Sequence, residues 1–318
     1  MSGKKIRVFD TFAGYGGAHF GFKKTKIPHE VVGFSEIDSY ADYIYKHNHG
    51  DIKNYGDITK IVPEDLPDFD VFTGGFPCQP FSQAGARLGE LDTRGTLFYD
   101  IIRICSVKKP KLILLENVKG ITTKKHTHTL EKIVSELKNI GYYVDYKVLN
   151  SKDFGIPQNR ERLWIVASKN KFPDNWDISP VKVELKLKFK DLLDKKVPEK
   201  YYLTDVQIAR IQELIEEDYK VQEPLCLDIY NKKIKRNGIS ITITEPHHNS
   251  LRVVEPPNNG KLVIRKLTPT ETFRFMGFQN DEIKFGELSD SQIYKRAGNG
   301  WDINVASKII KNIIDNLY

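Results

Sequence analysis

The first half of the chain alternates between short apolar runs and amphipathic segments. Runs typical of strands occur at 6–9, 30–38, 70–72, 111–115, 143–149 and 163–167. Segments with helical periodicity lie between them, at 40–47, 93–108 and 130–140. Strands that alternate with helices form crossover units, in which the strands are parallel. The pattern therefore predicts an α/β fold with a doubly wound, mostly parallel sheet.

The alternation breaks down between residues 169 and 265, where lysines are crowded. An amphipathic pattern predicts a helix at 205–218. A basic turn at 231–238 precedes an alternating run at 239–244, which predicts a strand. This stretch is therefore interpreted as an insert of short strands and loops with a basic edge.

Helical sequence returns near the C-terminus. Thr268 and Glu271 form a capping box with Pro269 at the first helical position, which predicts a helix start. An amphipathic helix is expected to end the chain. We therefore expect one domain made of 1–188 and 286–318, and a smaller, irregular, strand-rich domain at 189–285.

Composition narrows the class of protein. The chain has 318 residues, of which 40% are hydrophobic and 29% charged, as in globular proteins that remain in solution. No apolar run approaches the length of a membrane span, and the start has no signal-peptide character. Three widely spaced cysteines indicate a reducing, cytoplasmic compartment rather than a disulfide framework, and no metal-ligand spacing occurs. The net charge of +7 favours a polyanionic partner.

A glycine-rich turn follows the first predicted strand. Glycines at 14, 16 and 17 let a ligand approach the backbone at a helix N-terminus. The third glycine of a dinucleotide fingerprint would stand where the chain has His19, so a nucleoside-type ligand is favoured over a dinucleotide. Glu36 ends the second predicted strand, where doubly wound folds place the carboxylate that binds ribose hydroxyls. Residues 56–59 end a further strand-like stretch, and Asp57 within it is a candidate contact for an adenine amino group.

A rigid loop presents a cysteine after the strand at 70–72. Cys78 stands between Pro77 and Pro80, whose fixed φ angles prevent both strand and helix. A buried structural cysteine is the common alternative, but this setting favours a nucleophile. The small, polar, glycine-bearing stretch at 83–90 has the composition of a mobile lid.

Polar side chains also follow the later predicted strands. Glu116 ends the apolar run at 111–115, where a carboxylate lies in the ligand crevice of a doubly wound sheet. Arg160 and Arg162 are two apart, so at strand spacing both would face the same way. Paired arginines suit a phosphate or a polar base edge.

Together these motifs resemble the DNA cytosine C5-methyltransferase family of restriction-modification type. The resemblance covers nearly the whole chain in order, at 10–17, 36, 56–58, 75–82, 116–118, 158–162, 265–271 and 297–299. It implies a Rossmann-like methyltransferase fold, S-adenosyl-L-methionine as cofactor, and a target-recognition domain at 189–285. One departure is Gly300, where the family usually has a serine after Asn299.

The resemblance also implies a role for each matching residue. The catalytic residues would be Cys78, Glu116, Arg160 and Arg162. The cofactor contacts would be Phe12, Ala13, Gly14, Gly16, Gly17, Glu36, Ile37, Asp57, Ile58, Pro77, Leu97 and Asn299. The DNA contacts would be Gln83, Arg87, Lys233, Arg236 and Thr242.

The expected reaction is methyl transfer to C5 of cytosine within a short sequence of double-stranded DNA. The cysteine would add to C6 of a flipped-out base, and glutamate and arginine would stabilise the negative charge that develops. The enzyme is expected to be a bacterial monomer that protects DNA, with a cognate restriction endonuclease acting separately and association with the nucleoid through DNA.

The sequence disfavours two other functions. A tRNA cytosine-5 methyltransferase of the related RNA-acting branch typically carries Pro-Pro-Cys-Gln and Cys-Phe-Thr, whereas this chain has Phe76 before Pro77 and no Cys-Phe-Thr. An inactive, methyltransferase-like DNA-binding protein is disfavoured by the intact Cys78, Glu116 and Arg160.

Overall fold

The computed structural model describes residues 5–77, 97–214, 221–280 and 282–318. They form two compact units, which are treated separately below. Unit 1 comprises 1–149, 161–181 and 305–318, and unit 2 comprises 150–160 and 182–304. This division gives 150–160, 182–188 and 286–304 to unit 2, whereas the sequence-based bounds had placed them in the first domain. The roles predicted for the two domains stay predictions.

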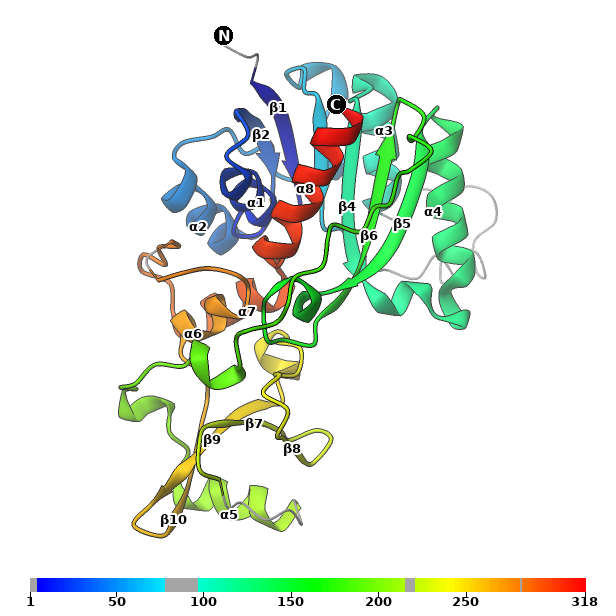
Figure 1. Cartoon of the computed structure of the whole chain (residues 1–318). Helices are drawn as coiled ribbons and strands as arrows, with labels where there is room; N and C mark the ends of the chain where they lie inside the picture. Colours follow the sequence, from blue (N-terminus) through cyan, green and yellow to red (C-terminus); the bar gives the residue numbers. More distant parts are fainter. Residues whose placement is uncertain (1–4, 78–96, 215–220, 281) are drawn as a thin grey trace, which may run out of the picture. The chain divides into compact units, whose positions relative to one another are not determined.

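Unit 1 is built on a six-stranded sheet (Figure 1). Its strands, in spatial order, are β2 (His29–Ser35), β1 (Ile6–Thr11), β3 (Val71–Gly74), β4 (Leu112–Val118), β6 (Glu161–Ser168) and β5 (Tyr143–Asn150). The pairs from β2 to β4 are parallel, and β6 is antiparallel to β4. The prediction of a doubly wound, mostly parallel sheet is confirmed.

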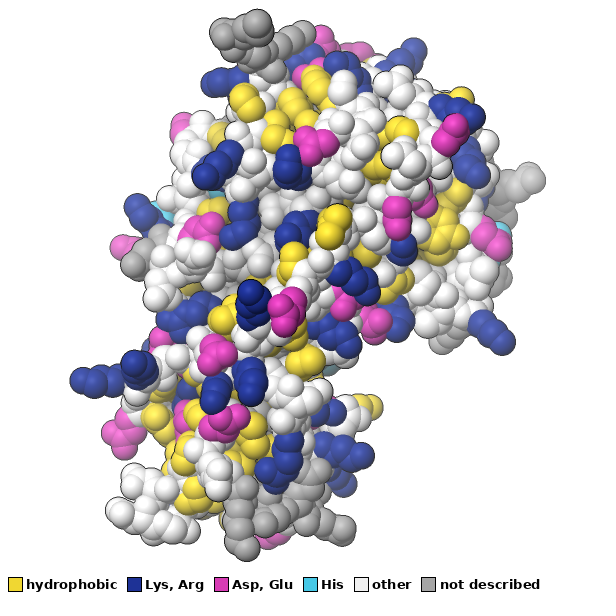
Figure 2. All heavy atoms as spheres, viewed as in Figure 1, with side chains coloured by type: hydrophobic (Ala, Val, Ile, Leu, Met, Phe, Trp, Pro, Cys, Tyr) yellow, Lys and Arg dark blue, Asp and Glu magenta, His cyan; other side chains and the backbone are white. Residues whose placement is uncertain are grey.

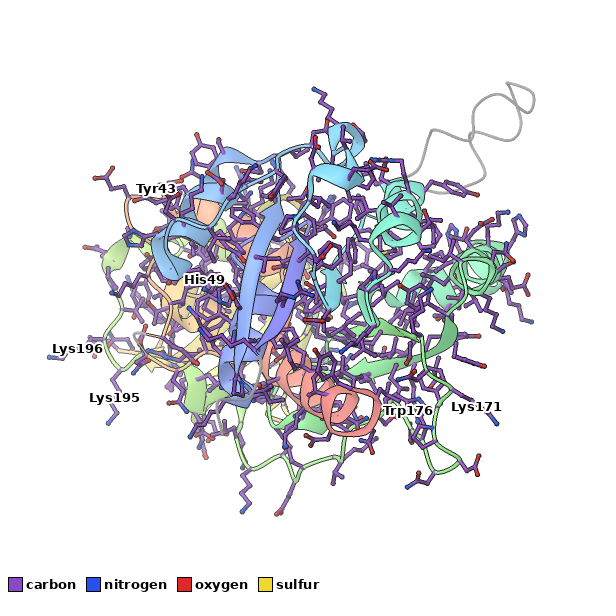
Figure 3. All side chains as sticks on the ribbon, turned by 90° about the horizontal axis from the view of Figure 1, so that it is seen from above. Tyr43, His49, Lys171, Trp176, Lys195 and Lys196 are labelled. Atoms are coloured by element: carbon purple, nitrogen blue, oxygen red, sulfur yellow. The ribbon has the colours of Figure 1, made fainter. Side chains whose placement is uncertain are left out.

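Helices cover both faces of this sheet (Figures 1 and 3). One face packs against α3 (Leu97–Lys108) and α4 (Thr127–Asn139) in a continuous apolar core. α8 (Ile303–Leu317) lies on the opposite face, where it contacts α1 (Gly17–Thr25) so closely that a Cβ at Gly21 would lie 2.9 Å from Ile310 Cδ1. α2 (Ser39–His49) follows β2. Short 3₁₀ helices lie at Ile58–Lys60, Pro63–Asp65, Lys119–Thr122 and Lys124–His126.

Unit 2 contains a four-stranded antiparallel sheet. Its order is β10 (Lys261–Arg265), β9 (Leu251–Asn258), β7 (Leu225–Asp228) and β8 (Lys233–Lys235). One face packs against α5 (Asp205–Leu214), and the other against an apolar cluster around Phe189 and Phe275. α6 (Pro269–Arg274) and α7 (Asp290–Asn299) follow, and 3₁₀ helices lie at Ser151–Phe154, Phe189–Leu192, Glu199–Tyr201 and Pro246–His248.

Two strand-like patterns in the sequence do not form strands. The alternating run at 239–244 has irregular backbone, apart from a single bridge that pairs Ser240 with Gln158. Its backbone groups bond the segment before β6 instead of joining the sheet, so alternation alone was misleading. Residues 56–59 lead into a 3₁₀ helix, because the Asp57 carboxylate accepts hydrogen bonds from both the backbone and the hydroxyl of Thr59.

Charge does not mark a single site on the face drawn in Figure 2. On the face drawn in Figure 2, lysine and arginine side chains are spread over both units, and acidic side chains lie among them. None of the described helices combines the length and apolar character that a membrane span requires.

The capping box at the start of α6 is confirmed, and it is part of a buried ion pair. The Thr268 hydroxyl accepts from the Glu271 amide, and Glu271 accepts from the Thr268 amide. Both Glu271 oxygens also accept from the Arg265 guanidinium, at 2.8 and 2.9 Å, and both side chains are fully buried. This pair holds the end of β10 to the start of α6.

Glu271→Gln should therefore destabilise the protein strongly. It would leave the Arg265 charge buried with only the partly exposed Glu255 to balance it, which costs about 3–5 kcal/mol for a broken buried pair. Urea unfolding measures the loss. The matched control is Glu223→Gln, whose exposed pair with Lys190 should contribute less than about 1 kcal/mol. Equal losses in the two variants would contradict this assignment.

Candidate active site

The predicted site residues of unit 1 lie along one edge of its sheet. Thr11 at the end of β1 is in register with Ser35 of β2 and Gly74 of β3, and Gly74 is in register with Leu115 of β4. The segments that follow these strands therefore begin side by side. β2 and β3 lie on opposite sides of β1, which is the reversal of strand order where doubly wound folds bind ligands.

The glycine turn after β1 has the conformation that its sequence predicts. Phe12, Gly14 and Gly16 have φ angles of 52°, 56° and 86°, all in the left-handed region. A Cβ at Gly16 would collide with the imidazole of His49 (labelled in Figure 3), so only glycine fits there. A Cβ at Gly14 would meet nothing within 4 Å, which leaves open space beside that backbone.

Glu36 holds this turn to the end of β2. Its Oε2 accepts from the Gly14 amide at 2.9 Å, and its Oε1 accepts from the amides of Ile37 and Asp38, also at 2.9 Å. The carboxylate is thus fixed by three backbone donors. Beside it, the apolar side chain of Ile37 is 77% exposed. An oriented carboxylate next to an exposed apolar side chain is suited to the hydroxyls and the flat ring of a nucleoside.

Other predicted cofactor residues have clear structural surroundings. Asp57 caps the 3₁₀ helix described above, and Ile58 is buried in the main core. Leu97 is partly buried against the same core, and Ala13 is buried with Phe34 and Tyr45. Their contacts with a cofactor stay predictions.

Asp10 is a buried acid at the end of β1. Its Oδ1 accepts from the Thr73 hydroxyl at 2.7 Å, and its Oδ2 has no hydrogen-bond partner among the described residues. Burial, which outweighs the effect of this hydrogen bond, raises the pKa of Asp10 to about 8. The neighbouring Thr11 hydroxyl donates to the Thr73 carbonyl. A Cβ at Gly74 would lie only 2.5 Å from the Thr11 hydroxyl oxygen. These contacts lock β1 to β3.

Asn117 fixes the backbone that leads to the predicted nucleophile. Its Nδ2 donates to the Phe76 carbonyl at 3.0 Å, and both residues are buried. Pro77 follows and is exposed. Cys78 itself, like Gln83 and Arg87, lies outside the described residues. Asn117 was not among the predicted site residues, because a hydrogen bond between residues 41 positions apart leaves no local signal in the sequence.

Glu116 and Arg162 form an ion pair at the same edge. Arg162 Nε lies 3.1 Å from Glu116 Oε1, and the two side chains are 16% and 10% exposed. They come together because β4 and β6 are antiparallel: Val118 pairs with Arg162, and Glu116 with Trp164. Side chains two apart on one strand share a face, so Glu116 and Arg162 are diagonal neighbours. The structure brings these two predicted catalytic residues together.

The other two cysteines are poor candidates for a nucleophile. Cys105 and Cys226 are both buried and free. Burial raises the pKa of Cys226 to about 12 and that of Cys105 well above its usual range. Since the thiolate is the reactive form, these two thiols are inert. The described residues also contain no group of His, Cys, Asp or Glu side chains able to hold a metal ion.

Arg160 lies in unit 2, where its guanidinium binds backbone. It donates to the carbonyls of Ile243, Gly298 and Gly300, and its side chain is 2% exposed. Gln158, two residues earlier, bonds the Ile243 amide and the Phe275 carbonyl. These bonds are a sufficient structural reason for an arginine at 160. A direct contact between Arg160 and the substrate stays a prediction.

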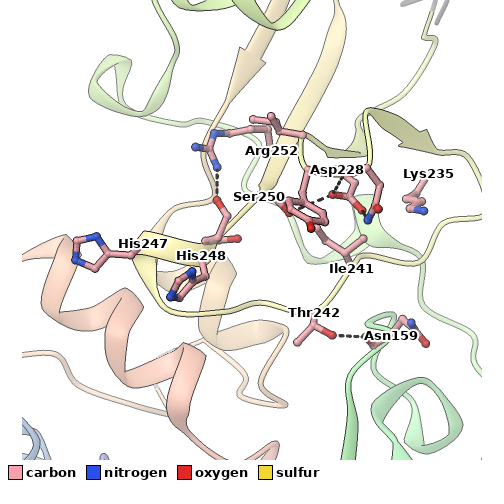
Figure 4. Close-up of a pocket in the computed structure, with 13 residues that line it drawn as sticks. Asn159, Asp228, Lys235, Ile241, Thr242, His247, His248, Ser250 and Arg252 are labelled. Carbon is pink, nitrogen blue, oxygen red and sulfur yellow. Dashed lines mark hydrogen bonds between the residues drawn. The ribbon is translucent and has the colours of Figure 1, made fainter. Parts of the chain in front are cut away.

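The remaining predicted residues also lie in unit 2. Asn299 is exposed at the end of α7, and a Cβ at Gly298 would collide with the backbone of 244–245. Lys233 and Arg236 are exposed around β8. The Thr242 hydroxyl donates to the Asn159 carbonyl at 2.6 Å and lines a cavity (Figure 4).

Comparison with known proteins identifies the family. The family model described as C-5 cytosine-specific DNA methylase matches residues 6–315. The chain belongs to this family. It is 36% identical over 315 residues to the type II methyltransferase M1.ScrFI of Lactococcus lactis subsp. cremoris, covering 98% of this chain and 79% of that protein. It is 38% identical over 319 residues to M.HaeII of Haemophilus aegyptius, covering 99% and 94%.

Solved structures agree with the fold of a C-5 DNA methylase. A mutant of DNMT2 from Spodoptera frugiperda superposes with a TM-score of 0.78 at 20% identity, covering 98% of this chain and all of that one. The Entamoeba histolytica methyltransferase EhMeth gives 0.69 at 21% identity, covering 98% and 99%. At such identities the similarity establishes the fold alone, which is the predicted Rossmann-like methyltransferase fold.

The pKa of Asp10 predicts how the stability of this DNA methylase depends on pH. In the unfolded chain, Asp10 loses its proton near its ordinary pKa of about 4. In the folded protein, Asp10 keeps its proton until about pH 8. The folded state therefore binds more protons in this window, so rising pH destabilises it by up to about 1.4 kcal/mol per unit. Asp10→Asn should make the decline between pH 5 and 8 shallower.

Urea unfolding at several pH values measures this slope. Asp57→Asn is the matched control, because hydrogen bonds from Thr59 hold the pKa of Asp57 below its usual range and thus outside the window. If Asp10→Asn declined as steeply as the wild type, Asp10 would not be the titrating group.

Asn117→Ala should reduce methyl transfer to DNA about 10–100-fold, because it frees the Phe76 carbonyl and loosens the backbone before Cys78. Initial rates at saturating DNA measure the effect, and circular dichroism verifies folding. Asn312→Ala is the matched control. Asn312 lies on α8, and its side chain donates to the Asp177 carbonyl of unit 1 at 2.9 Å. Unchanged rates in Asn117→Ala would exclude a positioning role.

Proposed function

We propose that this protein transfers a methyl group from S-adenosyl-L-methionine to C5 of cytosine in double-stranded DNA, with Cys78 as nucleophile. The observation that carries the proposal is the arrangement at the end of β4. Glu116 pairs with Arg162 at 3.1 Å, and the adjacent Asn117 holds the Phe76 carbonyl two residues before Cys78. One strand end thus connects the acid, the arginine and the cysteine loop.

The chemistry requires these residue types. The Cys78 thiolate adds to C6 of the cytosine ring, and this addition makes C5 nucleophilic while negative charge moves toward N3 and O2. Glu116 interacts with N3 through a shared proton, and Arg162 holds both Glu116 and O2. After C5 is methylated and has lost its proton, the bond between Sγ and C6 breaks and the thiolate is restored.

Several residues of unit 1 fit S-adenosyl-L-methionine, which would supply the electrophilic methyl group. The open backbone at Gly14 admits a ligand, and the fixed Glu36 carboxylate can accept the ribose hydroxyls. The exposed Ile37 offers an apolar surface to the adenine. The unpartnered Oδ2 of Asp10 is a further polar atom beside the glycine turn.

Burial of the acid requires that the target base leave the duplex. Glu116 is only 7% exposed, so a stacked and paired cytosine cannot reach it. Flipping the base out costs a few kcal/mol, which contacts from the segment around Gln83 and Arg87 and from the 189–285 domain would offset. We therefore assign target recognition to that domain.

The biological setting follows from the same reaction. Relatives such as M1.ScrFI and M.HaeII are named type II methyltransferases. We propose that this enzyme protects DNA in a restriction-modification system, with a separate cognate endonuclease. It would act as a monomer in the bacterial cytoplasm, where its DNA substrate lies.

Bisulfite sequencing of DNA from cells that express the protein should reveal one methylated motif. In vitro, the wild type should be trapped covalently on duplex DNA carrying 5-fluorocytosine at that motif, because fluorine replaces the proton that must leave C5. Cys78→Ala should abolish trapping, whereas the controls Cys105→Ala and Cys226→Ala, which alter buried thiols, should retain it.

Two outcomes would overturn the proposal. Trapping that survives in Cys78→Ala would mean that another group is the nucleophile. A transfer assay that shows a preference for tRNA over duplex DNA would mean that the RNA-acting alternative is correct.

A further inference from the structure

Unit 2 contains a cavity of about 770 Å³ that the proposed reaction does not explain (Figure 4). One wall is the turn between β7 and β8, and the other is the segment 241–252. Its lining is mainly polar and includes Asn159, Asp228, Lys235, Thr242, His248 and Arg252. All of these residues belong to unit 2.

Hydrogen bonds fix both walls of the cavity. The buried Asp228 carboxylate accepts from the backbone and the side-chain amide of Asn231, at 3.2 and 2.7 Å, and from the Ser250 hydroxyl at 3.1 Å. This carboxylate therefore ties the β7–β8 turn to the start of β9. On the opposite side, Thr242 is held by Asn159. These hydrogen bonds hold the shape of the cavity without a bound molecule.

Two cationic side chains that line this cavity have N–H donors without a hydrogen-bond partner among the described residues. Arg252 Nη1 donates to the carbonyls of Asn249 and Leu251 at 3.1 and 2.7 Å, but its buried Nε has no partner in the described part of the chain. The Lys235 backbone pairs with Cys226 in the sheet, but its side chain makes no hydrogen bond or ion pair to any described residue. A buried donor without a partner costs about 1–3 kcal/mol, so the cavity is set up for a ligand that brings acceptors.

We infer that Lys235 and Arg252 read guanine bases next to the target cytosine from the major groove. This inference rests on the proposed function. Guanine presents two acceptors there, O6 and N7, and lysine and arginine are their usual partners. Asp228 is already occupied by Asn231 and Ser250, so the acceptor that cytosine N4 would need is not free.

The alternative is that the two cations bind phosphates. The two kinds of contact give different results on substitution. Loss of a base contact relaxes the preference at one position of the motif, whereas loss of a phosphate contact weakens binding to all sequences and reduces the salt slope by about one.

The experiment compares Lys235→Met, Arg252→Gln and the control Lys196→Met. Lys196 is an exposed lysine of the same unit, lies outside the cavity and extends into solvent (Figure 3). The wild-type motif is first determined by bisulfite sequencing. Methyl transfer is then measured on duplexes in which each guanine of the motif is replaced in turn by 7-deazaguanine, which lacks the N7 acceptor, or by adenine.

We expect each cavity variant to lose about tenfold or more of the wild-type discrimination at one guanine, with an unchanged salt dependence. Lys196→Met should discriminate at each guanine of the motif as the wild type does. The Lys235 side chain makes no bond to any residue that the structure describes, so Lys235→Met remains a test of the inference even if Arg252→Gln fails to fold.

Three outcomes would overturn the inference. The cavity variants could discriminate between guanine and its replacements as fully as the wild type does. Alternatively, they could bind all duplexes equally more weakly, with a reduced salt dependence of binding. The motif could also contain no guanine next to the methylated cytosine. A wild type that methylates no duplex DNA would instead refute the proposed function, so the two failures are distinguishable.

Discussion

The antiparallel pairing of β6 with β4 is the constraint on which the candidate active site depends. A parallel neighbour would bring its own carboxyl end to Glu116, whereas the antiparallel strand brings its first residues there, including Arg162. A shift of one residue in this register would turn Arg162 to the other face of the sheet. The buried side chains along both strands prevent such a shift. The packing of the core therefore fixes the geometry of the candidate active site.

The sequence motif that contains both arginines is divided between two units. Arg162 is the second residue of β6 in unit 1 and pairs with an acid, whereas Arg160 belongs to unit 2 and binds three carbonyls. Strand spacing predicted that both would face the same way and act on one ligand, but Arg160 precedes the strand, so the spacing rule does not apply to it. An arginine suits both environments, because its planar fork can bind a carboxylate or several carbonyls at once.

Local patterns in the sequence predicted the parts of the site that local physics determines. The glycine turn, Glu36 and Glu116 each follow a predicted strand, and the sheet aligns their strand ends. The capping box at Thr268 was equally local. Long-range contacts were not predictable in this way, since neither the hydrogen bond between Asn117 and Phe76 nor the ion pair between Arg265 and Glu271 has a recurring spacing.

The alternating run at 239–244 shows why pattern alone can mislead. Alternation indicates that every second side chain is buried, but it does not specify what the backbone binds. Here the Ser240 amide donates to the Pro157 carbonyl and the Ser240 carbonyl accepts from the Asn159 amide. The Ile243 amide donates to the Gln158 side chain, and the Ile243 carbonyl accepts from Arg160. A segment from before β6 therefore occupies the place of a neighbouring strand. This arrangement leaves Ile241 and Thr242 on the cavity instead of in a sheet.

The two sites differ in how their polar groups are satisfied. In unit 1, the side chains that position the chemistry bond to the chain itself, as Glu36 does with three amides and Asn117 with a carbonyl. Catalysis benefits from such preorganisation, because groups that are already oriented cost no further ordering during the reaction. In the cavity of unit 2, the carboxylate is satisfied but the cations keep unpaired donors. In the base-reading role proposed for this cavity, that arrangement favours selectivity, because only a ligand with matching acceptors compensates the donors, and a mismatched base leaves them unpaired.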